Sequence, residues 1–277
     1  MYPRPFEYQR VSSVQEAVSI LQSNPEAKII AGGHSLLPAM KLRLASPELL
    51  VDISKVQDLK QMSVNGGATI GAGVTYNDLL KSDELKQAYT ALYESVAKVG
   101  DVQVRNRGTI GGSAAHADPA ADIPAALLAL NATLVVEGPN GQREISADDF
   151  FIDILTTALE PDEILTQIKL PAGAGSSAYE KFAHPASGYA ICGVAAVVGN
   201  GDVRVAVGGA TYKATRLTGV EDALKGGNID QQAIENAVNN VGDQDWAGDH
   251  FASAEYRAHL TKVYAKRALM RAAGFNS

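Results

Sequence analysis

Two pairs of glycines, each followed by a helix pattern, most constrain what this chain can form. The first pair lies in residues 31–38, AGGHSLLP, after the apolar run 28–31, which predicts a buried strand, and before residues 36–44, which predict a helix. Because glycine has no side chain, backbone N–H groups there can approach an anion, and the helix start adds its dipole. The spacing departs from GxGxxG and lacks the Lys-Ser/Thr ending of a P-loop, so it predicts neither a Rossmann site nor a P-loop.

The second pair lies in residues 105–122, RNRGTIGGSAAHADPAAD, with Thr109 and Ser113 on either side. Backbone amides and short hydroxyls are the donors it offers. A helix capped by Asp118, with Pro119 at its first position, is a second interpretation, which accounts for Asp118 but not for the glycines. Taken alone, the first pair is more typical of an ordinary tight turn. Since the two loops belong to different α/β blocks, together they predict a grip on one dinucleotide from both sides.

Strand and helix patterns divide the chain into three parts, which we place at residues 1–55, 56–171 and 177–277. In the first part, Ser12 or Ser13 predicts the start of a helix with apolar positions from Val14 to Leu21, and residues 49–53 predict a strand. The second part predicts strands at 68–72, 133–137 and 164–170, and helices at 76–80, 85–99 and from Pro119. Pro171 and the stretch AGAGSS at 172–177 predict a linker.

The third part changes character. Residues 177–182, 189–198 and 203–208 predict three strands, with Asn200-Gly201 as a hairpin turn. Helices are expected at 217–224, 229–241 and 255–273. The expected architecture is a three-stranded sheet packed under helices, so the whole chain is α+β.

Composition narrows the function. A net charge of -7 argues against a nucleic-acid partner, because tracking a phosphate backbone needs a positive surface. The one cysteine, Cys192, allows neither an intrachain disulfide nor an iron-sulfur cluster held by this chain alone. His116 and Asp118 are too few for a zinc site, and His34 has no triad partner at a recognisable spacing, so we expect no metal and no catalytic residue. The start of the chain does not resemble a signal peptide, so we expect a cytoplasmic protein, with peripheral attachment to the inner membrane through a complex as an alternative.

Several stretches resemble the flavoprotein subunit of molybdenum hydroxylases, the carbon monoxide dehydrogenase and xanthine dehydrogenase family. They are AGGHSLLPAMKLRLASPELLVDIS, TIGGSAAHADPAADIPAAL, EILTQIKLP, AYEKFAHPASGYAICGVAAVV and AEYRAHLTKVYAKRAL, which span essentially the whole chain. The resemblance implies a PCMH-type FAD-binding fold, like that of vanillyl-alcohol oxidase, made of two α/β subdomains. A carbon monoxide dehydrogenase flavoprotein C-terminal domain is expected to follow it.

The resemblance also implies which residues contact FAD. The implied positions are Ala31, Gly32, Gly33, His34, Ser35, Leu36, Thr109, Ile110, Gly111, Gly112, Ser113, Asp122, Leu165, Lys181 and Tyr189. The two glycine loops would surround the pyrophosphate, and Tyr189 would lie close to the isoalloxazine ring. Without the resemblance, Tyr189 would be taken for an aromatic of a strand core and Lys181 for a solvated strand residue. Ser113 stands where the family more often has asparagine, so a hydroxyl replaces a side-chain amide at that position.

The implied function is electron transfer. A molybdopterin-binding large subunit would hydroxylate the substrate, a small [2Fe-2S] subunit would carry single electrons, and the FAD of this chain would pass them to a quinone, a cytochrome, oxygen or NAD. The family expectation is a dimer of such heterotrimers. Two alternatives remain open: a stand-alone FAD-dependent oxidase or reductase, and a non-redox nucleotide-binding or assembly module.

Overall fold

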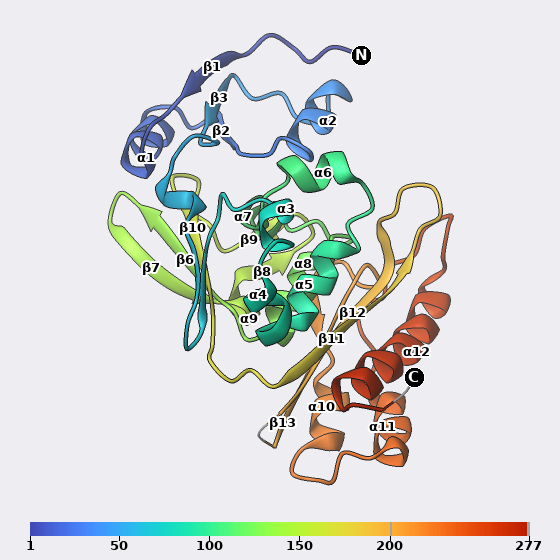
Figure 1. Cartoon of the computed structure of the whole chain (residues 1–277). Helices are drawn as coiled ribbons and strands as arrows, with labels where there is room; N and C mark the ends of the chain where they lie inside the picture. The colour runs from blue at the N-terminus through green and yellow to red at the C-terminus, as the bar shows by residue number, and fades with distance from the viewer. Residues whose placement is uncertain (200, 276–277) are drawn as a thin grey trace.

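Three short parallel strands form the N-terminal unit of the structure, a computed structural model that describes residues 1–199 and 201–275 (Figure 1). The strands are β1 (Glu7–Arg10), β2 (Ala27–Ile30) and β3 (Leu49–Asp52), in the order β1-β3-β2. Parallel neighbours need crossover connections, which here contain α1 (Val14–Ser23) and α2 (Leu36–Lys41). Helix α1 begins as expected, since Ser13 accepts a hydrogen bond from the Glu16 amide. Helix α2 is shorter than the expected helix over 36–44.

A five-stranded antiparallel sheet in the order β4-β5-β10-β6-β7 forms the second unit. Its strands are β4 (Met62–Val64), β5 (Ala68–Gly71), β6 (Thr133–Gly138), β7 (Gly141–Ser146) and β10 (Ile164–Leu170). Its helices are η1 (Asp58–Lys60), α3 (Tyr76–Leu79), α4 (Asp83–Ala88), α5 (Thr90–Ala97), α6 (Val102–Arg107), α7 (Ile110–His116), α8 (Asp122–Ala129) and α9 (Ala147–Phe150). A hairpin of β8 (Phe151–Asp153) and β9 (Thr156–Thr157) completes it.

Three expectations for this unit are wrong. The single helix over 85–99 is two helices, α4 and α5, because Tyr89 leaves the helical region (φ -137°, ψ 57°) and donates its hydroxyl to Pro171 O at 2.9 Å. The second glycine pair lies in the first turn of α7 rather than in a loop. The helix expected from Pro119 begins at Asp122, since the Asp118 carboxylate instead accepts the Ala120 amide in a preceding turn.

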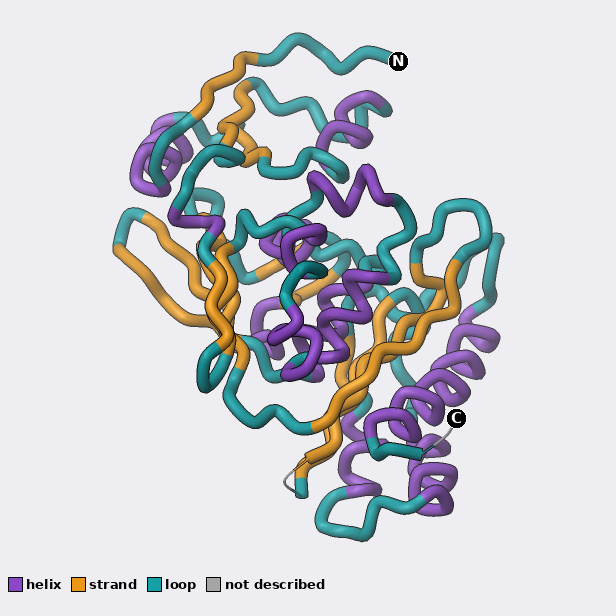
Figure 2. Tube along the Cα trace, viewed as in Figure 1, coloured by secondary structure: helices purple, strands orange, loops and turns teal. Residues whose placement is uncertain are grey.

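The C-terminal part is a sheet of four strands rather than three. Its strands are β11 (Ser176–Ala183), β12 (Ala190–Gly199), β13 (Asp202–Gly208) and the two-residue edge strand β14 (Thr215–Arg216). A loop connects β10 to β11 (Figure 2). The hairpin turn expected at Asn200-Gly201 includes Asn200, which lies outside the described residues. The helices are α10 (Thr218–Leu224), α11 (Gln231–Ala237), η2 (Val238–Asn240) and α12 (Ala254–Ala272), so the helix expected over 229–241 ends in a 3-10 turn.

This sheet is buried on both faces. Tyr179, Ala195 and Ala206 belong to one hydrophobic core with α5 and α8 of the second unit. Residues that alternate with them, such as Val194 and Val205, belong to another core with α10, α11 and α12. Burial on both sides explains why β12 is apolar almost throughout and why its strand could be predicted from a continuous apolar run.

A polar cluster joins α5, β11 and α12 where these elements meet. Arg271 on α12 forms ion pairs with Glu94 on α5 and with Glu180 on β11, the latter at 2.5 Å. Glu94 also accepts the Tyr179 amide at 2.8 Å, and Lys98 donates to Tyr179 O at 2.8 Å. Charges at the junction are thus hydrogen-bonded to partners in both units, and the cluster fixes the C-terminal sheet against α5. No helix in the described part of the chain is long and apolar enough to span a bilayer.

The edge strand β1 is held to β3 by Asp52, whose carboxylate accepts hydrogen bonds from the Tyr8 hydroxyl, from Arg10 at 3.1 Å and from the Ser54 amide at 2.7 Å. Burial alone would raise the pKa of Asp52, but these donors outweigh it and lower the pKa to about 2.

We therefore expect Asp52 to stabilise the fold at neutral pH and not in strong acid. The folded-state pKa lies below the ordinary value, so the contribution, about 2 kcal/mol, is present above about pH 4 and is lost as the pH falls towards 2. Urea unfolding of Asp52→Asn between pH 7 and pH 2 should show a deficit that shrinks in acid. A deficit independent of pH would contradict this role for the charge.

Candidate functional site

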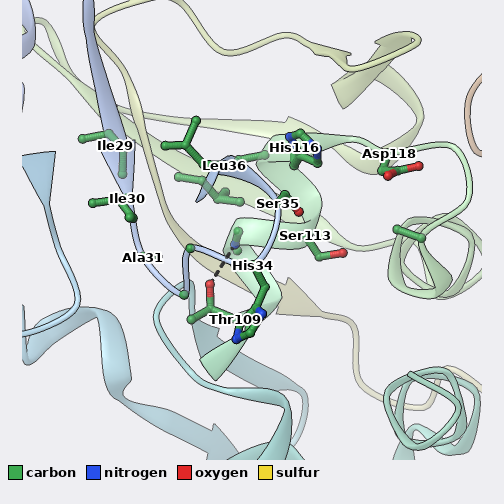
Figure 3. A pocket seen from close by; sticks show the side chains of 18 of the residues that line it. Ile29, Ile30, Ala31, His34, Ser35, Leu36, Thr109, Ser113, His116 and Asp118 are labelled. Carbon is green, nitrogen blue, oxygen red and sulfur yellow. Dashed lines mark hydrogen bonds between the residues drawn. The ribbon is translucent and has the colours of Figure 1, made fainter. Parts of the chain in front are cut away.

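A cavity of about 830 Å³ opens between the N-terminal unit and the second unit, and the loop before β12 contributes to its lining. Most residues expected to contact FAD line it (Figure 3). They are Ala31, Gly32, Gly33, His34, Ser35, Leu36, Thr109, Gly111, Gly112, Ser113, Asp122, Leu165 and Tyr189. Ile110 and Lys181 are not among the lining residues: Ile110 is fully buried in the core, and Lys181 lies behind Asp122.

The loop from β2 to α2 presents a run of unpaired backbone amides to this cavity. Among the described residues, no acceptor is hydrogen-bonded to the N–H of any residue from 32 to 36. Gly33 has φ +78°, a conformation that side chains disfavour, and Gly32 lies so close to α6 that an added Cβ would be 2.2 Å from Arg107 O. Consecutive free N–H groups at a helix start form an anion-binding concavity, so this loop suits a pyrophosphate.

Helix α7 differs from the expectation, because the chain itself pairs the amides at its start. The N–H of Ile110 donates to Val74 O and that of Gly111 to Ala72 O, at 3.1 and 3.0 Å. The Thr109 hydroxyl accepts the Gly112 amide at 3.0 Å (Figure 3). These glycines therefore let α7 pack against β5 and form a wall of the cavity, and the donors left for a ligand are side chains such as Ser113.

Asp122 and Lys181 meet in the interior, although their sequence separation gave no sign of it. Their side chains are 6% and 3% exposed, and Lys181 Nζ lies 2.8 Å from the Asp122 carboxylate and 3.0 Å from Lys98 O. The Tyr179 hydroxyl donates to the same carboxylate at 2.6 Å. Burial raises the pKa of Asp122 above its ordinary value, while Lys181 and Tyr179 act in the opposite direction. The interpretation of Lys181 as a solvated strand residue is wrong.

Tyr189 lies just before β12 at the cavity, with 48% of its surface exposed, so the interpretation as a strand-core aromatic is also wrong. Burial of the rest of its ring raises the pKa of its hydroxyl, and the nearby Asp118 and Asp122 raise it further. A half-covered aromatic ring at the mouth of a cavity can cover a flat ligand on one side.

Sequence reasoning missed other residues of the cavity. Tyr76 lines it from the start of α3, and burial raises the pKa of this hydroxyl to about 12. Leu155, Thr157 and Leu159, in and after the β8-β9 hairpin, line another side of the cavity. A Thr-Tyr pair at a helix start resembles any capped helix, and the hairpin has no glycine motif, so neither carried a signal. Among the described residues, no group of three or more His, Cys, Asp or Glu could hold a metal ion.

Two family models match the chain. Residues 4–173 match the FAD binding domain in molybdopterin dehydrogenase, and residues 177–272 match the CO dehydrogenase flavoprotein C-terminal domain. The chain is 39% identical to the carbon monoxide dehydrogenase medium chain of Hydrogenophaga pseudoflava, over 97% of both chains. It is 36% identical to the glyceraldehyde dehydrogenase medium chain of Sulfolobus acidocaldarius, over 99% of this chain and 100% of the other. The solved carbon monoxide dehydrogenase of Hydrogenophaga pseudoflava superimposes with a TM-score of 0.92 at 38% identity, with 98% of each chain covered.

The two matched domains define a flavoprotein, an FAD-binding chain with a two-part architecture. The chain belongs to the family of FAD-binding medium subunits of molybdenum hydroxylases, which includes the medium chain of carbon monoxide dehydrogenase, and it is an oxidoreductase subunit. The resemblance, the fold class and the FAD cofactor expected from the sequence are confirmed.

Gly32→Ala should weaken FAD retention without unfolding the chain. The added Cβ would meet Arg107 O, and overpacking of about 1–3 kcal/mol corresponds to roughly fivefold to 140-fold weaker binding if the strain falls on the loop. The matched control is Gly227→Ala, where the nearest atom to an added Cβ is 3.9 Å away. FAD content after gel filtration measures the effect, and retention equal to that of the control would count against the loop.

Lys181→Met should destabilise the fold by about 3–5 kcal/mol, because it leaves the Asp122 carboxylate buried without its cation. Lys181→Met combined with Asp122→Asn should recover much of the loss. Lys169→Met removes an exposed partner of Glu144 and should cost less than about 1 kcal/mol. Urea unfolding compares the variants, and equal losses for Lys181→Met and Lys169→Met would refute the buried pair.

Proposed function

We propose that this chain is the electron-transfer subunit of a molybdenum hydroxylase complex. It takes electrons from a partner [2Fe-2S] subunit and passes them to an external acceptor such as a quinone, a cytochrome, oxygen or NAD. The observation that carries the proposal is the row of free amides from residue 32 to 36 in a cavity of about 830 Å³. Bound FAD supplies a group that accepts electrons singly or in pairs.

Different residues of the cavity would bind different parts of such a cofactor. Amides 32–36 would bind the pyrophosphate, and the α7 wall would limit how far it can move. Tyr189 would cover the isoalloxazine ring and limit solvent access. Asp122, fixed by Lys181 and Tyr179, offers a carboxylate in a fixed position at the cavity. The proposed division into residues 1–55, 56–171 and 177–277 places the cofactor between the first two parts.

The chain's own composition supports this division of labour. Its single cysteine is buried inside β12, where burial raises the pKa of the thiol to about 12, so any iron-sulfur cluster belongs to a partner. Relatives of similar identity are named for carbon monoxide and for glyceraldehyde. We therefore assign substrate choice to a molybdopterin-binding large subunit. The assembly that we propose is a dimer of heterotrimers.

Mixing the purified chain with a chemically reduced [2Fe-2S] subunit tests the proposal. We expect the flavin absorption of the chain to bleach while the iron-sulfur absorption of the partner returns, and the released cofactor to chromatograph as FAD. A flavin that stays oxidised with the partner, yet is reduced by a small organic substrate alone, would indicate a stand-alone oxidase or reductase. A colourless chain that takes up no FAD would indicate the non-redox module.

A further inference from the structure

The short loop that delivers Tyr189 to the cavity is closed by two backbone hydrogen bonds of His184, to residues 188 and 189, and by its imidazole. His184 Nδ1 lies 3.2 Å from the Ala186 amide and 3.1 Å from the Ser187 amide, and both N–H groups donate to it. Ser187 Oγ lies 3.2 Å from the same nitrogen. Since backbone amides only donate, Nδ1 must carry a free lone pair, and the proton of the neutral ring is on Nε2.

This geometry repeats that of an Asx turn with a histidine in place of asparagine. In an Asx turn, a side-chain acceptor binds the amide two residues further on, and proline is favoured directly after it. Here Pro185 follows His184, and the loop continues with Gly188 at φ +72°. The turn is therefore organised by a side chain whose ability to accept depends on its protonation state.

This turn also fixes the main chain of Tyr189. The His184 amide donates to Tyr189 O at 2.8 Å, and the Tyr189 amide donates to Ser187 Oγ at 3.3 Å. Both main-chain groups of Tyr189 are thus paired inside the loop. The aromatic side chain of Tyr189 extends from this hydrogen-bonded loop and lines the cavity.

The imidazole is supported from outside by Phe251, whose ring centroid is 4.2 Å away and which is 56% exposed. The segment that carries Phe251 is fixed by Asp249, which pairs with the buried Arg257 at 2.6 Å. On the other side, Gly188 lies against Gly100, so the loop is clamped between two segments.

We propose that His184 is a positioning residue for Tyr189. It holds the tyrosine side chain at the cavity while Nδ1 of the imidazole is unprotonated, and it releases the tyrosine when Nδ1 is protonated. The inference rests on the proposed function in placing FAD in this cavity. A protonated Nδ1 would donate towards two amides that also donate, so the amides of residues 186 and 187 would lose their acceptor and the loop would keep only the backbone bonds of His184 to residues 188 and 189. Protonation of the imidazole would then loosen the cover of the flavin and change its access to solvent and to small acceptors.

Other charged groups lie near the loop, and their effects on it must be distinguished from the effect of His184. Asp101 and Asp118 belong to segments beside it at the cavity, and Asp249, His250 and Arg257 lie on the outer side. The Asp249-Arg257 pair is internally balanced, which leaves His250 as the nearby second imidazole. His34 and His116 also line the cavity. Variants of His184 alone, compared with His250→Gln, distinguish these groups.

The decisive variants are His184→Asn and His184→Ala. Asparagine keeps a side-chain acceptor for the amides of residues 186 and 187 but does not titrate, whereas alanine removes the acceptor. Hydrogen exchange of the loop amides, measured on the full-length chain and corrected for the intrinsic rate at each pH, reports the turn directly. The fluorescence of bound flavin, which a nearby tyrosine quenches, reports the position of Tyr189.

In the native chain, protection of the loop should fall roughly fivefold to tenfold as His184 is protonated, with a rise in flavin fluorescence. The control variant His250→Gln should show the same fall, because its His184 is intact. His184→Asn should stay protected and quenched across the same pH range, and His184→Ala should be open at every pH. Protection independent of pH in the native chain overturns the proposal. Protection that changes with pH without any change in fluorescence instead overturns the placement of Tyr189 beside the flavin.

Discussion

The buried carboxylate of Asp122 connects the cofactor cavity to the rest of the molecule. It sits in the first turn of α8 and is shared by the Tyr179 hydroxyl and the Lys181 ammonium, both on β11. A charged group this deep requires a partner, and its partner comes from the other part of the chain. Tyr179 reaches it across Gly193, where an added Cβ would lie 2.1 Å from the hydroxyl. The same contacts therefore fix both the position of the cavity wall and the docking of the C-terminal sheet.

Much of the fold could be predicted from local pattern. The strands β2, β3, β5, β6 and β10 to β13, and helices α1, α10 and α12, follow apolar periodicity that burial on one or both faces dictates. The break at Tyr89 had no such signal, because the hydrogen bond that stabilises it goes to Pro171, far along the chain. The same holds for β14, whose two residues are strand only because β13 lies beside them.

The candidate site likewise combines features that local sequence pattern predicts with contacts that depend on the tertiary structure. The glycine pairs predicted a ligand, and the loop after β2 has the free amides and the positive φ at Gly33 that suit an anion. The glycines of α7 line the cavity, but their amides are not free donors, since those of Gly111 and Gly112 are satisfied by Ala72 and Thr109. The contact with Ala72 is one that only the tertiary packing reveals. Lys181 was named from a resemblance, but its burial against Asp122 depends on a contact 59 residues apart in sequence.

The contrast between the two glycine segments has a thermodynamic consequence. The amides at the start of α7 are already paired with acceptors elsewhere in the chain and with Thr109, whereas the loop after β2 leaves a row of donors for something else to satisfy. An anion that fills that row adds binding free energy to the folded state alone, so it acts on the equilibrium between folded and unfolded chain by mass action. FAD therefore links cofactor supply to stability: the free energy of unfolding of the subunit rises with the concentration of free FAD.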